Sequence, residues 1–209
     1  MAFLSKERDV VEWLDKHCEL TGYADPPKYF SESNTVKIDR LGRVTVEDDV
    51  RIYCKDLTQI PVQFVEVTSD CYIVGSKLTS LLGCPREVGG SFVSNCKSLE
   101  TLAGGPKKVL YSYKIMGGDL KNLTGLVRQV GHDFWLPWHE ALPVLGVFYV
   151  RSAQARCNFT GDLSQPGAAV KSALVTDIIN RYLHLGPAGM MPASVELIKA
   201  GLSANARLD

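Results

Sequence analysis

A 21-residue repeat is the feature that most constrains the fold of this chain. Shifting the sequence by 21 residues aligns a column of leucines, then a second apolar column, then a column of glycines. The leucines are Leu57, Leu78, Leu99 and Leu120. The second column is Ile60, Leu81, Leu102 and Leu123, and the glycines are Gly83, Gly104, Gly125 and Gly146. A fixed period of this length is typical of solenoids, in which each turn buries its apolar side chains against the next turn.

Two mostly apolar positions, separated by one residue, precede the leucines in each unit. The first members of these pairs are Val50, Cys71, Phe92, Tyr113 and Phe134. The second members, in the same order, are Ile52, Ile73, Ser94, Ile115 and Leu136. Because alternate residues of a strand face the same side, this spacing predicts one short strand per turn. Strands of successive turns would then pair about 4.8 Å apart in a parallel sheet.

We therefore predict an α/β solenoid of about five 21-residue turns with a parallel sheet. A partial sixth turn aligns Cys157 with Leu136 and Leu163 with Leu142. A fourth apolar column, which closes the core of each turn, is Val67, Val88, Val109 and Val130. The predicted parts are an N-terminal helix and cap over 1–43, the repeat solenoid over 44–164 and a C-terminal helical cap over 165–209. Solenoids have apolar ends, so capping elements are expected at both.

The N-terminal segment predicts a helix over residues 5–20. Ser5 is a favourable N-cap residue, and acidic residues follow it in the first turn. One apolar stripe on this helix consists of Val10, Leu14 and Cys18. Residues 21–35 are rich in Pro, Ser and Asp and predict a loop. The short strands expected after this loop are Val36–Ile38 and 44–46.

Two helices are predicted at the C-terminal end. The first begins near Pro166, which suits the first turn of a helix, and stops at Gly186 and Pro187. Its apolar stripe consists of Val170, Leu174, Ile178, Tyr182 and Leu185. The second helix spans about 192–206. Its apolar face consists of Val195, Ile198 and Leu202. We expect these helices to cap the solenoid, and the alternative is that one of them docks on a partner.

Four stretches of the repeat carry a likeness to known repeats. IVGSKLTSL from Ile73 and FVSNCKSLETL from Phe92 resemble leucine-rich repeats of the short bacterial type. CPREVGG from Cys84 and GPKKV from Gly105 are similar to a repeat found in bacteriophage-encoded proteins. The resemblance covers about residues 44–150 and implies a leucine-rich-repeat-like stack of turns. It also implies a bacteriophage accessory protein that binds a host protein in the host cytoplasm and inhibits or redirects it, for example in counter-defence.

One column departs from the pattern of these repeats. The short bacterial repeats place an asparagine after the strand, where it satisfies backbone groups at the bend. The equivalent column here reads Lys55, Ser76, Lys97, Gly118 and His139. We therefore expect a less regular curve, without a regular ladder of asparagines.

Composition disfavours several classes of protein. The chain of 209 residues has 23 Lys+Arg, 23 Asp+Glu and 45% hydrophobic residues, so its formal net charge is zero. A disordered chain and a general nucleic-acid binder both need a stronger charge imbalance. No run approaches the roughly 18 apolar residues of a membrane span, so no membrane partner is expected. The six cysteines form no CxxC pair and no export signal precedes them, which predicts reduced thiols and a cytoplasmic location.

No motif for catalysis or cofactor binding is found in the sequence. Phosphate-binding loops, the GxSxG elbow, HExxH and zinc-finger spacings are all missing. The densest cluster of chemical groups is His132, Asp133, His139 and Glu140. A small metal-dependent or acid/base enzyme using this cluster is the alternative function. These groups flank one predicted strand at opposite ends, too far apart to share an ion, so we assign no catalytic residue, no metal ligand and no cofactor.

The outward face of the predicted strands is where we expect a partner to bind. It is unusually aromatic and apolar for an exposed face, and Tyr, Trp and Arg are common in interface hot spots. The predicted partner-binding residues are Arg51, Tyr53, Tyr72, Val74, Val93, Asn95, Lys114, Met116 and Trp135. Pro137 continues the same face. We therefore predict a non-enzymatic protein-binding module. Pairing of two copies through this face is a variant, and cover by a cap helix or the N-terminal arm is the alternative.

A basic row gives a further alternative, an RNA-binding solenoid. The cations concerned are Lys55, Arg86, Lys97, Lys107, Lys114 and Arg128. Of these, Arg86, Lys107 and Arg128 share one loop column of the repeat. Because the net charge is zero, we interpret this column as a solvated edge and do not expect nucleic acid as a partner.

Overall fold

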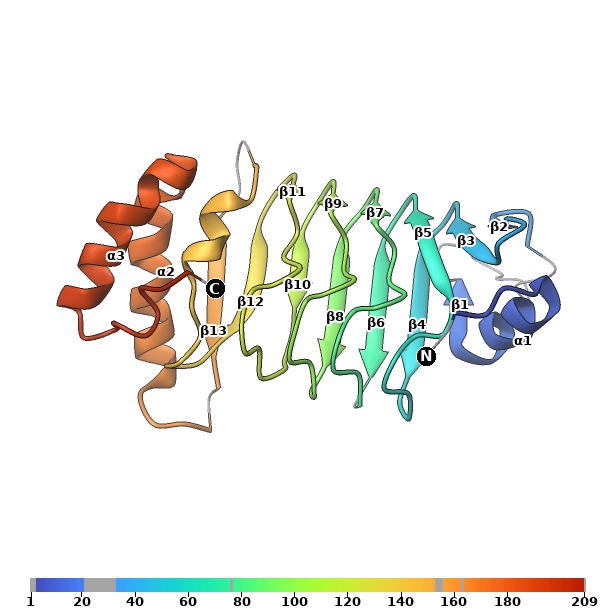
Figure 1. Cartoon of the computed structure of the whole chain (residues 1–209), viewed down its shortest axis with the longest axis horizontal. Helices are drawn as coiled ribbons and strands as arrows, with labels where there is room; N and C mark the ends of the chain where they lie inside the picture. Colours follow the sequence, from blue (N-terminus) through green and yellow to red (C-terminus); the bar gives the residue numbers. More distant parts are fainter. Residues whose placement is uncertain (1–2, 21–32, 76, 153–155, 163, 209) are drawn as a thin grey trace.

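The computed structural model describes residues 3–20, 33–75, 77–152, 156–162 and 164–208. Figure 1 shows an elongated stack of turns with helix α1 (Glu7–His17) at one end. Helices α2 (Ala168–Leu183) and α3 (Met190–Lys199) lie at the other end. The turns form a β-solenoid of about five units of about 21 residues, as the repeat predicts. None of the helices in the described residues is both long enough and apolar enough to cross a bilayer.

The first of two sheets contains the strands predicted from the repeat. Its strand order is β1-β4-β6-β8-β10-β12-β13. The strands are β1 (Cys18–Leu20), β4 (Val50–Cys54), β6 (Cys71–Gly75), β8 (Phe92–Cys96), β10 (Tyr113–Ile115), β12 (Phe134–Trp138) and β13 (Cys157–Gly161). The register pairs Val50 with Cys71 and Cys71 with Phe92, so the period is kept from turn to turn. From β4 onward all neighbours are parallel, and antiparallel β1 closes the N-terminal edge.

A second sheet lies on the other side of the core and has the order β11-β9-β7-β5-β3-β2. The strands are β2 (Val36–Ile38), β3 (Arg43–Val46), β5 (Gln63–Val67), β7 (Glu87–Val88), β9 (Lys108–Val109) and β11 (Gln129–Val130). The two strands predicted ahead of the solenoid are confirmed as β2 and β3. The valine column lies on the inward side of β5, β7, β9 and β11. The last three strands have only two residues each, too few for an alternating pattern to reveal them.

The core between the sheets consists of the apolar columns of the repeat. Both members of the strand pairs and both leucine columns are buried, apart from Leu57, which is half-buried. Phe92 and Tyr113, from adjacent turns, stack with ring centroids 5.5 Å apart. One turn alone could not remove this surface from water, so the stability of each turn depends on its neighbours.

Gly104 shows why the repeat needs its glycine column. Its φ of 83° lies in the left-handed region. A Cβ at this position would lie 2.6 Å from the Cα of Leu82 in the preceding turn. Gly83 and Gly125 combine a positive φ with an equally close approach. The turns therefore pack together at this corner more closely than any side chain allows.

The sixth turn differs from its prediction by two residues. β13 pairs Cys157 with Phe134 and Phe159 with Leu136, whereas the strict period aligned Cys157 with Leu136. Two additional residues lie between β12 and β13, in a connection that includes the 3-10 helix η2 (Leu145–Tyr149). The predicted partner of Leu142 in this turn, Leu163, lies outside the described residues.

The N-terminal helix is shorter than the predicted span of 5–20. It begins after Lys6 rather than at Ser5, and its N-cap makes no side-chain hydrogen bond. Residues Cys18–Leu20 leave the helix to form β1, because the edge of β4 offers them backbone hydrogen bonds. The rest of the predicted stripe, Val10 and Leu14, is buried in α1. Most of the loop predicted over 21–35 lies outside the described residues.

Helix α2 buries Ile178 of the predicted stripe but otherwise turns a different face to the core. Its buried residues are Ser172, Val175, Ile178 and Ile179. Val170 and Leu174 are instead 74% and 41% exposed, and Leu185 lies beyond the helix and is 46% exposed. The reason is that α2 runs along β13, so the residues that meet this strand are buried whatever their hydropathy. The predicted stop is confirmed, since α2 ends at Leu183 and the 3-10 helix η3 (Gly186–Gly189) follows.

Helix α3 ends at Lys199 rather than continuing to 206 and packs on the outside of α2. It buries Ala193 and Leu197. Of its predicted inward face, Val195 and Ile198 are 42% and 55% exposed, while Leu202 is buried just beyond the end of the helix. The two helices form the outermost layer of this end of the molecule in Figure 1, so the far side of α3 has no further layer of the described chain to pack against.

Candidate functional site

The outward side chains of the first sheet form two rows that cross five strands. The strand register places Arg51 beside Tyr72 and Tyr53 beside Val74, and the pattern continues along the sheet. The predicted residues thus lie together on one surface, which we call the strand face. Its members are Arg51, Tyr53, Tyr72, Val74, Val93, Asn95, Lys114, Met116 and Trp135.

Two apolar side chains of the strand face are well exposed. Val74 is 41% and Met116 46% exposed, while the aromatic residues of the face are half-buried. Met116 follows β10, and its N–H donates to the Ser94 carbonyl at 2.7 Å, which keeps it in register with the row. Pro137 was expected in this row but is buried, where it pairs with Thr160 of β13. The exposed part of the row formed by Tyr53, Val74, Asn95 and Met116 therefore ends at Met116.

Polar contacts hold the two tyrosines of the strand face in place. The Tyr72 hydroxyl donates to Asp70 Oδ2 at 3.1 Å, and the Arg51 guanidinium lies 5.5 Å from the centre of the Tyr72 ring. The Tyr53 hydroxyl donates to Glu19 Oε2 of β1 at 2.9 Å. Burial raises the pKa of Tyr72, and the hydrogen bond to Asp70 raises it further. Rings that are already ordered lose little conformational entropy when a partner binds.

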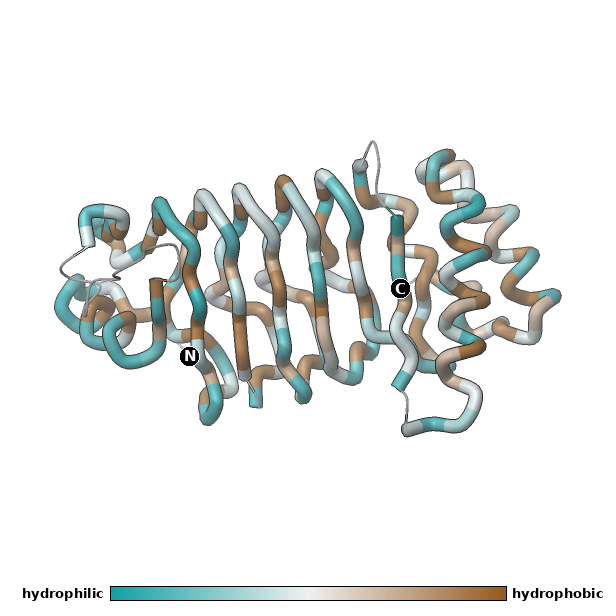
Figure 2. Tube along the Cα trace, turned by 180° about the vertical axis from the view of Figure 1, so that it is seen from behind, coloured by the Kyte–Doolittle hydropathy of each residue, from teal (hydrophilic) through white to brown (hydrophobic). Residues whose placement is uncertain are grey.

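The helices of the described chain do not cover the strand face. Figure 1 places α1 at one end of the stack and α2 and α3 at the other. Figure 2 shows the opposite side, where the helices again flank the turns and hydrophobic segments recur at equivalent places along them. The alternative that a cap helix lies over the strands is therefore wrong for the three helices described.

A hollow of about 720 Å³ lies where the strand face meets α2. Trp135 and Asn158 line it from β12 and β13, and Asp177 and His184 line it from the helix side. Because Trp135 belongs to both the strand face and this hollow, the two form one continuous surface. A side chain of a docked partner would enter the hollow beside an aromatic ring, an arrangement common in interface hot spots.

The His132–Glu140 cluster is separated by the structure as the sequence indicates. His132 precedes β12 and stacks on Tyr111, with ring centroids 4.7 Å apart. His139 follows β12 at the opposite bend, and Glu140 pairs with Lys171 of α2. Within the described residues, no three His, Cys, Asp or Glu side chains are placed to hold a metal ion.

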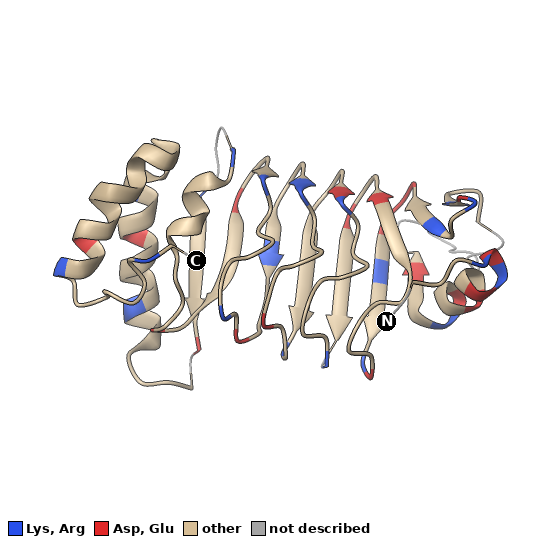
Figure 3. Ribbon diagram, viewed as in Figure 1, with Lys and Arg blue, Asp and Glu red and all other residues tan. Residues whose placement is uncertain are grey.

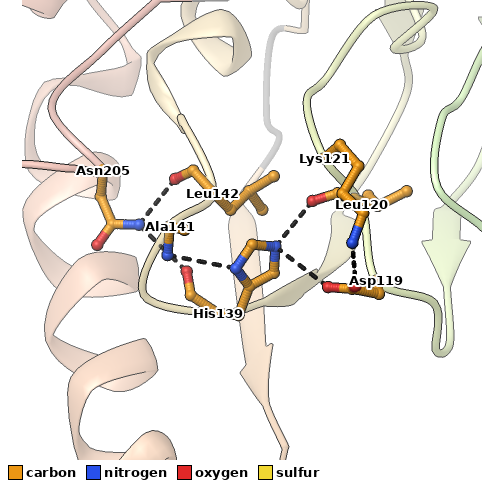
Figure 4. Close-up of polar contacts among 7 residues, drawn as sticks. All are labelled: Asp119, Leu120, Lys121, His139, Ala141, Leu142 and Asn205. Carbon is orange, nitrogen blue, oxygen red and sulfur yellow. Dashed lines mark hydrogen bonds and ion pairs between the residues drawn. The ribbon is translucent and has the colours of Figure 1, made fainter.

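His139 connects the bends of two successive turns (Figure 4). Its Nδ1 accepts the Ala141 N–H at 3.2 Å, so its Nε2 carries the proton and donates to the Leu120 carbonyl at 2.8 Å. Asn205 then donates to the His139 carbonyl at 3.3 Å and to the Leu142 carbonyl at 2.7 Å. The asparagine missing from this column is thus replaced by a histidine that satisfies backbone groups of its own bend and of the previous one. Ser76 of the same column lies outside the described residues.

Aspartates just before the strands form links that sequence reasoning missed. Asp49 Oδ1 accepts the Asp70 N–H at 2.8 Å, and Asp70 Oδ1 accepts the Ser91 N–H at 2.6 Å. Asp133 Oδ1 accepts the Arg156 N–H at 3.2 Å. The 21-residue spacing of Asp49 and Asp70 was the available signal. These carboxylates fix the starts of β6, β8 and β13, and Asp70 also holds Tyr72 of the strand face.

The six cations of the RNA alternative do not form one surface. Lys114 lies on the strand face, and Lys55 and Lys97 follow β4 and β8 at the bends. Only Arg86, Lys107 and Arg128 lie side by side, just before β7, β9 and β11.

Comparison with known proteins finds no matching protein family, no matching curated protein and no matching solved structure.

Proposed function

We propose that this chain is a non-enzymatic protein-binding module whose partner docks on the strand face. The observation that carries the proposal is a row of aromatic, apolar and cationic side chains on a regular sheet, which none of the three described helices covers. Tyr72, Trp135 and Arg51 are the residue types that dominate interface hot spots. Two of the rings are already fixed by hydrogen bonds or by a cation above them, which lowers the entropic cost of docking.

The partner we propose is a host protein. The repeat units resemble those of bacteriophage-encoded proteins, and such a protein would act inside the host cell by inhibiting or redirecting what it binds. A formal charge of zero and a face of low charge favour a partner recognised by shape and apolar contact rather than by long-range attraction. A second copy of the chain on the same face is the competing outcome.

Photo-crosslinking from the strand face tests this proposal. A benzophenone side chain at Asn95, which is exposed on the face, is compared in host lysate with the same group at Lys77, which lies in a bend. We expect a discrete adduct with a host protein from position 95 and none from position 77. Adducts of equal yield from both positions, or no adduct from either, would contradict the proposal. An adduct of twice the mass of the chain would instead identify a homodimer.

Two sets of substitutions then test which side chains bind. Tyr72→Ala with Trp135→Ala removes the aromatic anchors, and Val74→Asp with Met116→Asp places charges on the exposed apolar positions. We expect both to abolish the adduct while the melting temperature stays nearly unchanged. Tyr149→Ala is the matched control, since Tyr149 is 58% exposed and lies outside the strand face. A large fall in melting temperature for the aspartate pair would mean that this face is covered.

A further inference from the structure

Four cations lie on successive turns beside the second sheet. The Lys107 N–H donates to the Arg86 carbonyl at 2.8 Å, and the Arg128 N–H donates to the Lys107 carbonyl at 2.9 Å. The Arg151 N–H continues the series by donating to the Arg128 carbonyl at 2.8 Å. These bonds place the backbones of neighbouring cations about 4.8 Å apart, which is the spacing of paired strands. We call Arg86, Lys107, Arg128 and Arg151 the cation row.

Within the described part of the chain, no acidic side chain forms an ion pair with the cation row. Lys107 Nζ donates to the Gly125 carbonyl at 3.3 Å. Partial burial lowers the pKa of Lys107, and the charges of Arg128 and Arg86 lower it further. Like charges held this close repel each other, and a bound anion would relieve that repulsion.

The charge of this side of the molecule changes sign along the solenoid. Figure 3 shows acidic residues on β5 and β7, and basic residues on β9 and just before β11. The acidic positions are Glu66 and Glu87, and Lys108 of β9 lies 3.7 Å from Glu87. Positive charge is therefore concentrated toward the C-terminal turns, although the whole chain is neutral.

An exposed ring pair lies across the second sheet from the cation row. Tyr111 and His132 stack at 4.7 Å with an interplanar angle of 23°, and Tyr111 is 58% exposed. Tyr111 follows Lys107 by four residues, and His132 follows Arg128 by four. Residues 108–109 and 129–130 are extended while 110–111 and 131–132 bend, so the rings lie at most about 13 Å from the cation row along the chain. A strip of surface is thus bounded by cations on one side and by stacked rings on the other.

We propose that this strip binds a single-stranded phosphodiester chain, with phosphates on the cation row and a base on the Tyr111–His132 pair. Guanidinium groups match phosphate oxygens with two parallel hydrogen bonds. Arg and Lys have long, flexible side chains, so cations whose backbones lie about 4.8 Å apart can spread to meet successive phosphates of an extended strand. Bases stack on aromatic rings with little sequence preference. An acidic peptide would satisfy the cation row but leave the exposed ring pair without a role.

Salt dependence of oligonucleotide binding tests the proposal. Anisotropy of a fluorescein-labelled single-stranded poly(U) is measured between about 50 and 200 mM salt. Four neutralised cations give a slope of log K against log salt of about −2.8 for a single strand, and Arg128→Gln or Arg151→Gln lowers its magnitude to about 2.1. Lys77→Gln is the matched control, because Lys77 pairs with Asp56 away from this strip. Its slope is expected to equal that of the unchanged protein.

Variants of the ring pair separate stacking from charge. Tyr111→Leu or His132→Leu is expected to weaken binding about fivefold or more, since stacking stabilises by about 1–3 kcal/mol per base, while the salt slope stays the same. The proposal is overturned if poly(U) fails to bind at low salt, or if Arg128→Gln and Lys77→Gln behave alike. It is also overturned if poly-L-glutamate displaces poly(U) at equal charge concentration, which would assign the strip to acidic proteins. Because the strip lies apart from the strand face, these outcomes are independent of the crosslinking results.

Discussion

The side-chain amide of Asn180 in α2 pairs with the backbone of Cys157 in β13 as a neighbouring strand would. Its Oδ1 accepts the Cys157 N–H at 2.9 Å, and its Nδ2 donates to the Cys157 carbonyl at 2.7 Å. One turn earlier in the helix, Thr176 Oγ1 accepts the Phe159 N–H at 2.9 Å. The last strand of the sheet would otherwise present unpaired groups to solvent or to another chain, and α2 removes that liability.

Replacing Asn180 should therefore destabilise the protein by more than a surface substitution. Asn180→Leu leaves the N–H and the carbonyl of Cys157 without partners, and each lost bond costs about 1–3 kcal/mol. We expect the free energy of unfolding in urea to fall by about 2–5 kcal/mol. Asn180→Asp keeps the acceptor, so its free energy of unfolding should lie between that of the leucine variant and that of the unchanged protein. A leucine variant within about 0.5 kcal/mol of the unchanged protein would show that α2 does not complete the sheet.

Gly104→Ala and Gly167→Ala separate two causes of strain. Both glycines have a positive φ, 83° and 78°, but only Gly104 faces backbone at 2.6 Å, while Gly167 has open space around its missing Cβ. Gly167→Ala should cost about 1–2 kcal/mol for the left-handed conformation alone. Gly104→Ala should cost at least about 2 kcal/mol more, because adjacent turns must move apart. Equal losses in chemical denaturation would exclude close packing as the reason for this glycine.

Tyr113→Phe is expected to stabilise the protein. Tyr113 is fully buried, and its hydroxyl has no hydrogen-bond partner among the described residues. Burial raises the pKa of this phenol, so the hydroxyl stays neutral and still requires a partner. Removing it ends the desolvation cost while the ring keeps its stacking on Phe92, which should raise the free energy of unfolding by about 1 kcal/mol. A loss of stability would reveal a bond to this hydroxyl.

The six cysteines should resist alkylation in the native protein. All are free and buried. Burial raises the pKa of Cys54 to about 12, with a smaller contribution from Cys96, and burial raises the pKa of Cys71 as well. At pH 8 about one Cys54 thiol in ten thousand is therefore the reactive thiolate. Mass spectrometry after iodoacetamide should show no adduct in buffer and six in urea, and rapid native labelling would contradict the burial.

Substitutions on the two sides of α3 should differ sharply. Leu197 is fully buried, so Leu197→Ala is expected to cost about 2–5 kcal/mol. Ile198, its neighbour in the chain, is 55% exposed, so Ile198→Gln should change the free energy of unfolding by no more than about 0.5 kcal/mol. Comparable losses at both positions would mean that the exposed side of α3 is covered in solution.

The repeat was predictable because it depends on contacts between equivalent positions. Leu78, Leu99 and Leu120 occupy equivalent positions in successive turns and are all fully buried, so a single column of leucines identifies the core. The strand face followed from the same alternation. The second sheet was harder to predict because β7 and β9 have only two residues, of which one valine faces inward.

The helical caps could not be predicted in the same way. Helix α2 meets β13 through Thr176 and Asn180, which are polar because they satisfy a strand edge, and the buried Ser172 donates to the Ala169 carbonyl of its own helix. A search for an apolar stripe therefore selects Val170 and Leu174, which are exposed. The fourth member of the cation row was missed for a related reason. Arg151 follows Arg128 by 23 residues rather than 21, because the connection before β13 is longer.

The 21-residue register is constant from β4 to β12, so the strand face consists of a whole number of equivalent strands. Each unit enters and leaves its turn at equivalent points, and β1 and α2 end the sheet without depending on how many units lie between them. Duplicating or deleting one unit in evolution would thus lengthen or shorten the strand face by about 4.8 Å while both ends stay intact. The packing between neighbouring turns would be the same in the longer and the shorter protein.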